Sequence, residues 1–235
     1  MPTGRSTAAK KSAAKVLVVD DHPVVRQGFA ELIDQNHDLK VCGQAEDAAS
    51  ARDALRDTKP DVLVLDLSLE GASGLDFLEG LKATYPKLPV LVLSMHDESL
   101  YAERALRAGA RGYIMKERPI QEVMTAIRRV LAGEVYLSDR MSARLLRRAV
   151  MGQPTTSASP VETLSNRELQ VFELIGQGYE TGDIAAKLHL SVKTVHTHRE
   201  NIKKKLSVAN GTELHQQAFM WMQREPAAGK RPIER

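Results

Sequence analysis

The chain has 235 residues, of which 43% are hydrophobic, enough for one or two globular domains with ordinary cores. Its single cysteine excludes an internal disulfide, and no apolar stretch approaches the roughly 20 residues that a membrane-spanning helix requires. The formal net charge of +3 excludes few partners by itself.

The N-terminal segment, residues 1–14, is expected to be a disordered basic tail. It carries Arg5, Lys10 and Lys11 among small residues, and it lacks the apolar core of a signal peptide. We therefore expect a cytoplasmic protein. Cys42 falls in the apolar stretch 39–42, which favours a small core residue over a nucleophile.

From Lys15 to Leu131, short apolar runs alternate with amphipathic ones. The runs predict five strands, at residues 16–19, 39–42, 62–65, 90–93 and 112–115. Each is followed by a predicted helix, at residues 23–33, 47–56, 74–83, 98–108 and 119–131. This alternation is typical of an α/β fold with a doubly wound, five-stranded parallel sheet. We expect that domain to span residues 15–135.

Carboxylates end two of the predicted strands. The run 16–19 stops at Asp20 and Asp21, and the run 62–65 stops at Asp66. An aspartate at one such place is most simply a loop residue. However, the carboxyl ends of parallel strands share one sheet edge, where three carboxylates would repel one another unless a cation neutralised them. Together they predict a Mg2+ site.

Two other strands end on a hydroxyl and on an ammonium group. Ser94 follows the run 90–93, and Lys116 follows Tyr113-Ile114-Met115. Each alone would be an ordinary cap or surface residue. On the same edge as the three aspartates, they complete a site that suits a phosphoryl group.

These residues, in this order and spacing, resemble the receiver domain of bacterial response regulators. The resemblance implies that a sensor histidine kinase phosphorylates Asp66. It also implies that Asp20, Asp21, Asp66 and the backbone carbonyl of Ser68 hold Mg2+. Ser94 would then bond the phosphoryl oxygens, Lys116 would pair with the anion, and Tyr113 would swing inward on activation.

Two positions depart from the receiver pattern. Glu70 and Glu117 stand where receivers commonly have proline, and the second variant is frequent in the subfamily named below. Glu70 adds a carboxylate near the metal site, so it bears on the phosphorylation rates rather than on the class of protein.

Two other functions fit part of this pattern. An aspartate-nucleophile phosphohydrolase would also use Asp66 and Mg2+, but it needs an aspartate two residues later, where the chain has Ser68. A regulator that keeps the fold but senses a ligand or partner would not need the complete set of site residues that is present here.

Residues 136–161 are expected to form a connector. The segment 139–150 has a helical pattern, and residues 151–160 are rich in glycine, proline, serine and threonine, as a linker is. The charge also changes here: residues 15–136 carry 15 basic and 20 acidic side chains, whereas residues 137–235 carry 15 and 10. A nucleic-acid partner is therefore expected at the second half.

Residues 162–224 have the pattern of a helix-turn-helix domain. Ser165 and Glu168 have the spacing of a capping box at the start of one helix. A short helix over 184–188, a turn, and a basic helix that Ser191 caps and that runs to about Leu206 follow. On the basic helix, Val195, Ile202 and Leu206 form an apolar stripe opposite polar residues.

The stretch from Leu164 to Leu214 resembles the LuxR-type helix-turn-helix domain. A receiver followed by this domain is the architecture of the NarL/FixJ group of response regulators, which are DNA-binding transcription factors. The resemblance places His196, Thr197 and Glu200 at base-reading positions. The expected DNA-binding residues are Lys193, Thr194, His196, Thr197, His198, Glu200, Lys203 and Lys204.

The last predicted helix, 211–222, carries Leu214, Ala218, Trp221 and Met222. These side chains are expected in the core, although an exposed apolar side would be the dimer contact that the family implies. We therefore expect a homodimer in the active state, promoter DNA as the target, and a flexible end at residues 225–235. The function indicated is phosphorylation-controlled transcription regulation, without enzymatic turnover of an external substrate.

Overall fold

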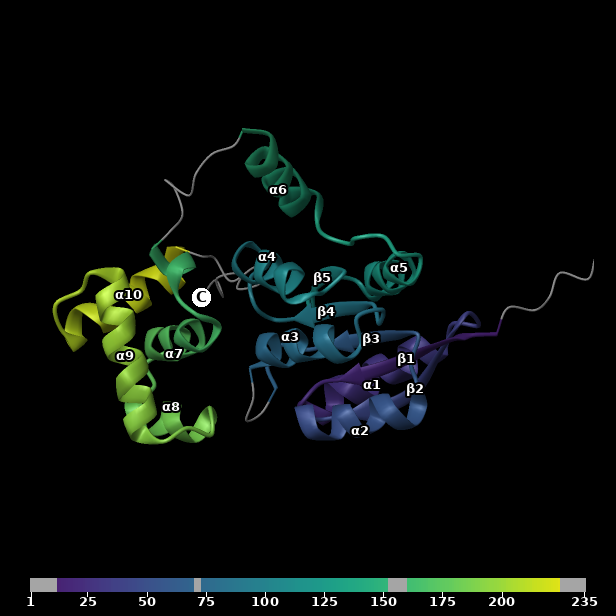
Figure 1. Ribbon diagram of the computed structural model, residues 1–235, viewed down its shortest axis with the longest axis horizontal. Helices are drawn as coiled ribbons and strands as arrows, with labels where there is room; N and C mark the ends of the chain where they lie inside the picture. The colour runs from purple at the N-terminus through teal and green to yellow at the C-terminus, as the bar shows by residue number, and fades with distance from the viewer. Residues whose placement is uncertain (1–11, 70–72, 152–159, 225–235) are drawn as a thin grey trace, which may run out of the picture.

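The computed structural model describes residues 12–69, 73–151 and 160–224. Most of the predicted tail, Glu70, most of the predicted linker and the C-terminal end lie outside the described residues. The described part forms an α/β domain, a connecting helix and a helical domain (Figure 1). No helix in these ranges is long and apolar enough to cross a membrane.

The described residues of the α/β domain form five strands and five helices in alternation. They are β1 (Ala14–Val19), α1 (Pro23–Asp34), β2 (Leu39–Ala45), α2 (Ala48–Thr58), β3 (Val62–Leu65), α3 (Gly74–Thr84), β4 (Val90–Ser94), α4 (Glu98–Ala108), β5 (Gly112–Met115) and α5 (Ile120–Leu131). The strands are all parallel, in the order β2-β1-β3-β4-β5. The predicted doubly wound parallel sheet is therefore confirmed.

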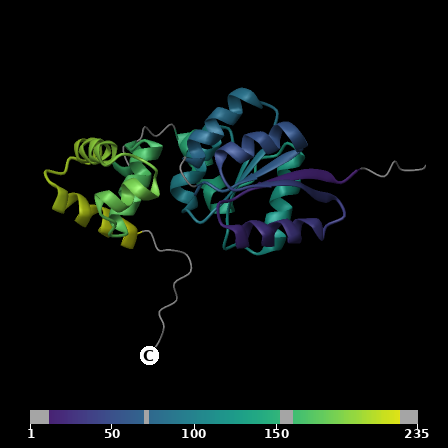
Figure 2. The ribbon, with the colours of Figure 1, turned by 90° about the horizontal axis from the view of Figure 1, so that it is seen from below.

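Helices cover both faces of this sheet (Figure 2). Val16 and Val18 of β1 belong to a core with α1 and α5, whereas Leu17 and Val19 belong to a core with α2, α3 and α4. Because both faces are buried, the positions of the central strands β3 and β4 are all buried, which explains the continuous apolar runs there in the sequence.

Some predicted boundaries differ from those observed. Strand β2, predicted over residues 39–42, extends to Ala45. Strand β1 begins at Ala14, inside the predicted tail, because the Ala14 amide donates to the Asp38 carbonyl, 2.9 Å away. In the helical domain, the second helix begins at Thr181 and not at Ile184. Its first turn is polar, so the apolar pattern did not reveal it.

A connecting helix and four further helices complete the described chain. They are α6 (Asp139–Met151), α7 (Asn166–Gly176), α8 (Thr181–Lys187), α9 (Val192–Leu206) and α10 (Gly211–Arg224), with a short 3-10 helix, η1 (Pro160–Thr163), before α7. The predicted helical domain of about four helices is confirmed. Its core includes Phe172, Ile184 and Ile202, each fully buried, and Trp221 packs on Phe172 with ring centroids 5.5 Å apart.

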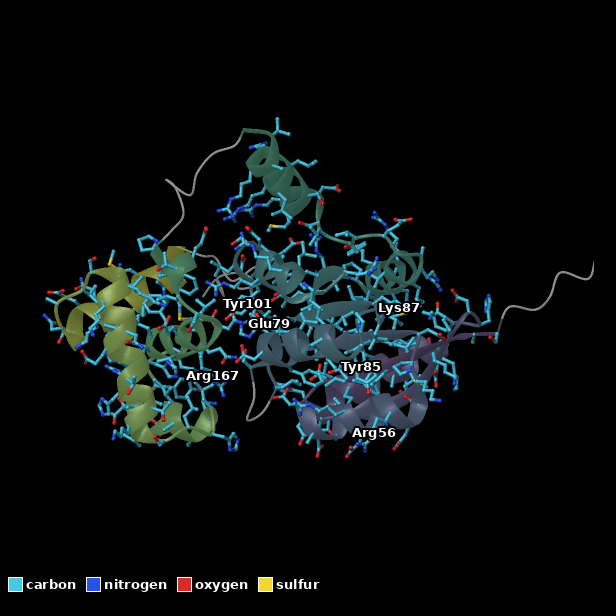
Figure 3. The ribbon with its side chains drawn as sticks, viewed as in Figure 1. Arg56, Glu79, Tyr85, Lys87, Tyr101 and Arg167 are labelled. Atoms are coloured by element: carbon cyan, nitrogen blue, oxygen red, sulfur yellow. The ribbon has the colours of Figure 1, made fainter. Side chains whose placement is uncertain are left out.

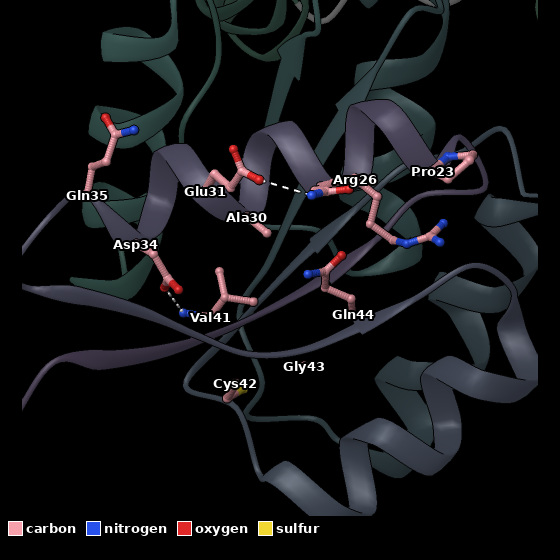
Figure 4. Close-up of a pocket in the computed structure, with 11 residues that line it drawn as sticks. Pro23, Arg26, Ala30, Glu31, Asp34, Gln35, Val41, Cys42, Gly43 and Gln44 are labelled. Atoms are coloured by element: carbon pink, nitrogen blue, oxygen red, sulfur yellow. Dashed lines mark hydrogen bonds between the residues drawn. The ribbon is translucent and has the colours of Figure 1, made fainter.

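A groove lies between α1 and the edge strand β2 (Figure 4). Its charged side chains already have partners: Arg26 donates to the Asp20 carbonyl, Glu31 accepts from Gln27, and Asp34 accepts from the Val41 amide. Cys42 also lines the groove. It is half-buried, with its Sγ 3.4 Å from the Val16 carbonyl oxygen, which is consistent with the predicted packing role.

Candidate functional site

The sheet brings Asp20 and Asp66 together at the carboxyl ends of β1 and β3. These strands are neighbours in register, with Val19 opposite Leu65, and the Asp66 amide donates to the Val19 carbonyl at 2.8 Å. Both aspartates are buried, with exposures of 3% and 2%. The convergence of the acids is therefore a consequence of strand pairing.

Lys116 occupies the space between the two buried carboxylates. Its Nζ lies 2.6 Å from Asp20 Oδ2 and 2.6 Å from Asp66 Oδ2. Burial favours the neutral amine, but the neighbouring charge of Asp66 and the hydrogen bonds to both aspartates outweigh it, so the pKa of Lys116 is raised. The lysine is therefore a permanent cation in the site.

One lysine does not neutralise the whole cluster. Ligand atoms of Asp20, Asp21, His22 and Asp66 all lie within 4.8 Å of one another. Burial and the two nearby acids raise the pKa of Asp21, although His22, whose Nδ1 is 2.6 Å from Asp21 Oδ1, opposes the shift. Asp66 Oδ1 is buried and has no hydrogen-bond partner among the described residues. An unpartnered buried carboxylate oxygen among acids fits a hard cation such as Mg2+.

Ser94 and Tyr113 lie next to this cluster and are both fully buried. Ser94 Oγ accepts a hydrogen bond from the His96 amide at 3.3 Å, and Tyr113 donates from its hydroxyl to the His96 carbonyl at 2.7 Å. Burial raises the pKa of the Tyr113 phenol well above its usual range. Its ring already lies inside the protein in this structure, so the predicted inward swing stays a prediction.

Ser68, two residues after Asp66, lies in the same loop cluster. Its Oγ is 3.3 Å from His96 Nε2. The backbone of Gly74, at the start of α3, lies close to the backbone of Leu67. A Cβ on Gly74 would lie 2.5 Å from Leu67 Cα, so only glycine fits there. Glu117 is exposed, and Glu70 lies outside the described residues.

In the helical domain, side chains fix the start of each helix-turn-helix element. Ser165 and Glu168 form the predicted capping box at α7, and Ser191 accepts from the Thr194 amide at the start of α9. Glu168 also accepts from Lys205 Nζ at 2.6 Å, which ties α9 to α7. Burial opposes the ionised form of Glu168, but Lys205 and Ser165 outweigh it and lower the pKa.

The predicted apolar stripe of α9 is confirmed. Val195, Ile202 and Leu206 are buried. The polar side is turned outward: the exposed residues are Lys193, His196, Thr197, Glu200 and Lys204. Of the other predicted DNA contacts, Thr194, His198 and Lys203 are half-buried.

The surroundings of these three half-buried residues were not indicated by the sequence. Lys203 Nζ lies 2.7 Å from Glu200 Oε1, and this lysine lowers the pKa of Glu200. His198 lies partly in the domain interior, and burial lowers its pKa. Thr194 Oγ1 is 2.7 Å from Ser191 Oγ at the start of the helix.

Helix α10 combines core residues with an exposed apolar side. Leu214 and Ala218 are fully buried, as predicted, and Trp221 is half-buried. Phe219 and Met220 are 56% and 44% exposed. These two exposed apolar residues were not among those predicted.

The two domains touch through residues that the sequence did not single out. Tyr101 of α4 lies at the domain boundary (Figure 3), where its hydroxyl donates to Glu173 Oε2 of α7 at 2.9 Å. Arg104, one turn along α4, donates to the carbonyls of Val161, Glu162 and Leu164 and to Asn166 Oδ1. Each is an ordinary helix residue in the sequence, so only the docking reveals its role.

Comparison with known families identifies both domains. Residues 16–128 match the response regulator receiver domain, and residues 162–218 match the bacterial regulatory proteins of the luxR family. The chain therefore belongs to the two-component response regulators with a LuxR-type DNA-binding domain, which are transcription regulators and not enzymes.

Individual relatives have the same arrangement over most of their length. The chain is 37% identical to the oxygen regulatory protein NreC of Staphylococcus epidermidis over 210 residues, covering 87% of this chain and 96% of that protein. Among solved structures, it is similar to RcsB from Salmonella enterica serovar Typhimurium, bound to a promoter in the presence of the phosphomimetic BeF3−. That match has 25% identity, a TM-score of 0.62, and coverage of 88% and 98% of the two chains.

A second solved relative covers only part of this chain. It is a two-component response regulator of the LuxR family from Aurantimonas, 34% identical, with a TM-score of 0.55, covering 59% of this chain and 99% of its own.

Proposed function

We propose that this chain is a transcription regulator that a sensor histidine kinase controls by phosphorylating Asp66. The observation that carries the proposal is the state of the two Asp66 oxygens. Oδ2 lies 2.6 Å from Lys116 Nζ, whereas Oδ1 is buried without a partner in the part of the chain that the structure describes. A carboxylate that is oriented by a fixed cation and keeps one free oxygen is suited to nucleophilic attack.

The acidic cluster is the proposed site of Mg2+. Asp20, Asp21, Asp66 and the backbone carbonyl of Ser68 would hold the ion. When bound, it neutralises the charge that the aspartates and the phosphoryl oxygens would otherwise place side by side.

The transfer then requires positioning and charge compensation from this chain. An Asp66 oxygen bonds to phosphorus as the bond from phosphorus to the kinase histidine breaks, and the histidine keeps that electron pair. The product is a mixed anhydride. Lys116 pairs with the phosphoryl oxygens and the Ser94 hydroxyl donates to them, while Tyr113 fills the space beside Ser94.

A hydrolase that turns over an external substrate is the weaker alternative. Such an enzyme needs an acid two residues after the nucleophile, and Ser68 carries a hydroxyl that lies 3.3 Å from His96. Neither group is a carboxylic acid.

The DNA-binding surface proposed is the outward side of α9. His196, Thr197 and Glu200 are exposed near its start and middle, where base edges are read in a major groove. Lys193 and Lys204 are exposed nearer its ends, and Thr194, His198 and Lys203 border them, which suits contacts to phosphates. The promoter-bound RcsB structure supports this assignment.

The active form proposed is a homodimer. Phe219 and Met220 supply an exposed apolar side on α10, and a structure of two RcsB dimers on two parallel DNAs is similar to this chain. A dimer would read two symmetric half-sites. Because chromosomal DNA is the target, the compartment proposed is the cytoplasm.

The test measures DNA binding with and without beryllofluoride and Mg2+, in wild type and in Asp66→Asn. A DNA sequence that the protein binds is first selected from a pool of random DNA duplexes, with wild-type protein in the presence of beryllofluoride and Mg2+. We expect beryllofluoride to raise the affinity of wild type at least about tenfold and to leave Asp66→Asn unchanged. Equal affinity in all four samples would reject phosphorylation control while leaving the DNA-binding role intact.

A further inference from the structure

His96 lies two residues after Ser94, in the loop between β4 and α4. Its amide donates to Ser94 Oγ at 3.3 Å, and its carbonyl accepts from the Tyr113 hydroxyl at 2.7 Å. Its ring Nε2 lies 3.3 Å from Ser68 Oγ. Three residues assigned to the phosphorylation site thus hold His96 by its backbone and by one ring nitrogen.

The rest of the His96 ring is directed toward the DNA-binding domain. The ring stacks on Tyr101, with centroids 4.4 Å apart and planes 22° from parallel. Its Nδ1 lies 3.6 Å from Glu173 Oε2, the same oxygen that accepts the Tyr101 hydroxyl at 2.9 Å. One oxygen of α7 is therefore shared by two residues of the receiver domain.

Glu173 connects this contact to the core of the DNA-binding domain. Its side chain is 14% exposed, and it follows Phe172, which packs on Trp221 of α10. Burial raises its pKa, and His96, Tyr101 and Arg104 oppose the shift. A carboxylate in such a place gains from every donor that the receiver domain offers and loses stability when one leaves.

We propose that His96 is the positioning residue that couples the state of Asp66 to the DNA-binding domain, by holding or releasing Glu173. The inference rests on the proposed function and extends it to a specific contact between the domains. It assigns His96 no part in the phosphoryl transfer itself.

The physical basis is a movement of the Ser94 side chain, whose hydroxyl can donate to a phosphoryl group on Asp66 while its oxygen accepts from the His96 amide. In this structure Ser94 Oγ accepts from the His96 amide through a long hydrogen bond of 3.3 Å. A phosphoryl group on Asp66 draws the Ser94 hydroxyl toward itself, because a charged acceptor forms the stronger bond. The displacement passes to His96, whose contact with Glu173 is already at 3.6 Å. A small movement therefore breaks it.

Other contacts between the two domains remain when His96 releases Glu173, so the domains do not separate completely. Arg104 still holds η1 and the start of α7 through three carbonyls and Asn166. The outward residues of α9 are exposed in the docked arrangement, so docking does not work by covering them. Instead it fixes one orientation of the domain beside the acidic receiver, whose charge repels DNA phosphates.

Coupling between two sites is reciprocal, so a change at Glu173 should change the affinity of the Asp66 site in a defined direction. If a phosphoryl group on Asp66 weakens the Glu173 contact, then loss of that contact strengthens binding of a phosphoryl mimic by the same factor. A purely structural role for Glu173 would change thermal stability but not the affinity of a site in the other domain.

The experiment measures beryllofluoride affinity calorimetrically in the full-length protein with Mg2+ present and DNA absent. The variants are Glu173→Gln, which preserves shape, and Glu180→Gln, a matched control at an exposed glutamate of the same domain. We expect Glu173→Gln to bind beryllofluoride about fivefold or more tightly than wild type and the control to stay within about twofold. Trp221 fluorescence confirms that each variant is folded.

A double-mutant cycle tests the part played by His96. In a His96→Ala background, Glu173→Gln should have no further effect on beryllofluoride affinity, because the contact between the His96 ring and Glu173 is already absent. An unchanged affinity in Glu173→Gln, or a full effect in both backgrounds, would overturn the coupling. Failure of wild type to bind beryllofluoride would overturn the proposed function as well, so the two failures are distinguishable.

Discussion

Lys116 and Asp66 form a buried ion pair across the end of the sheet, with Nζ 2.6 Å from Oδ2 and side-chain exposures of 7% and 2%. They are 50 residues apart in the sequence, and the pairing of β3 with β4 and of β4 with β5 brings them together. This relationship fixes both the orientation of the proposed phosphoacceptor and the cation that faces it.

Replacing Lys116 by glutamine should weaken beryllofluoride binding at least about tenfold, because the fixed cation is lost while the acids remain. Calorimetric titration in Mg2+ measures the change. Lys87→Gln is the matched control, since Lys87 is exposed on the surface. Equal loss in both variants would show that the effect is one of overall charge.

Mg2+ should stabilise the protein, and Asp21 should be required for that effect. At an ion concentration 100 times the dissociation constant, one site contributes about 2.7 kcal/mol to the free energy of unfolding. The melting temperature measured with and without Mg2+, in wild type and in Asp21→Asn, tests this. Asp57→Asn, at an exposed position of α2, is the control and should keep the full increase.

Without Mg2+, the Asp21 carboxylate should lower the stability of the protein instead of raising it. Its pKa is raised in the folded state, so folding loses stability as the pH rises from the ordinary aspartate range through the raised value. At neutral pH without metal, Asp21→Asn should therefore be more stable than wild type. A lower urea midpoint for the variant under these conditions would contradict the assignment.

Glu168 should stabilise the DNA-binding domain in a pH-dependent way. Its folded-state pKa is lowered, so its contribution is present above the ordinary glutamate pKa and is lost as the pH falls through the lowered value. Glu168→Gln should cost about 1 to 2 kcal/mol at neutral pH. Urea unfolding followed by the fluorescence of Trp221, the only tryptophan, should show the two proteins converging in acid.

Close packing of α7 on α10 should make Gly176 intolerant of a side chain. A Cβ there would lie 2.7 Å from Met222 Sδ and 2.9 Å from the Ala218 carbonyl oxygen. Gly176→Ala should cost about 1 to 3 kcal/mol, read as a lower urea midpoint. Gly182→Ala is the control, because no atom of the described residues lies within 4 Å of its Cβ position.

Glu200 should contribute to DNA sequence preference. It is exposed on the proposed DNA-facing side of α9, where a carboxylate accepts from a cytosine amino group or repels wrong sequences. It is paired with Lys203, whose positive charge balances that of the carboxylate. Binding-site selection with Glu200→Ala should yield a relaxed or altered base at one position, and an unchanged preference would reject this role.

Much of the fold was predictable because its signals are local. The parallel strands are continuous apolar runs, since both sheet faces are buried, and Ser165, Glu168 and Ser191 cap helices through neighbours three residues away. The start of α8 was predicted three residues late, because Thr181, Gly182 and Asp183 carry no apolar pattern. Exposure of Phe219 and Met220 was also missed, since a short helix does not reveal which apolar side is covered.

The sequence by itself determined which residues end the strands. It also determined that Asp20, Asp21, Asp66, Ser94 and Lys116 share one edge, because strands that alternate with helices run parallel and have their carboxyl ends on the same side. Only the tertiary structure decided what each atom contacts. It placed Lys116 between two acids, left Asp66 Oδ1 without a partner among the residues described, and docked Tyr101 and His96 on Glu173. Those contacts join elements far apart in the chain through single polar side chains, and such pairs leave no periodic pattern in the sequence.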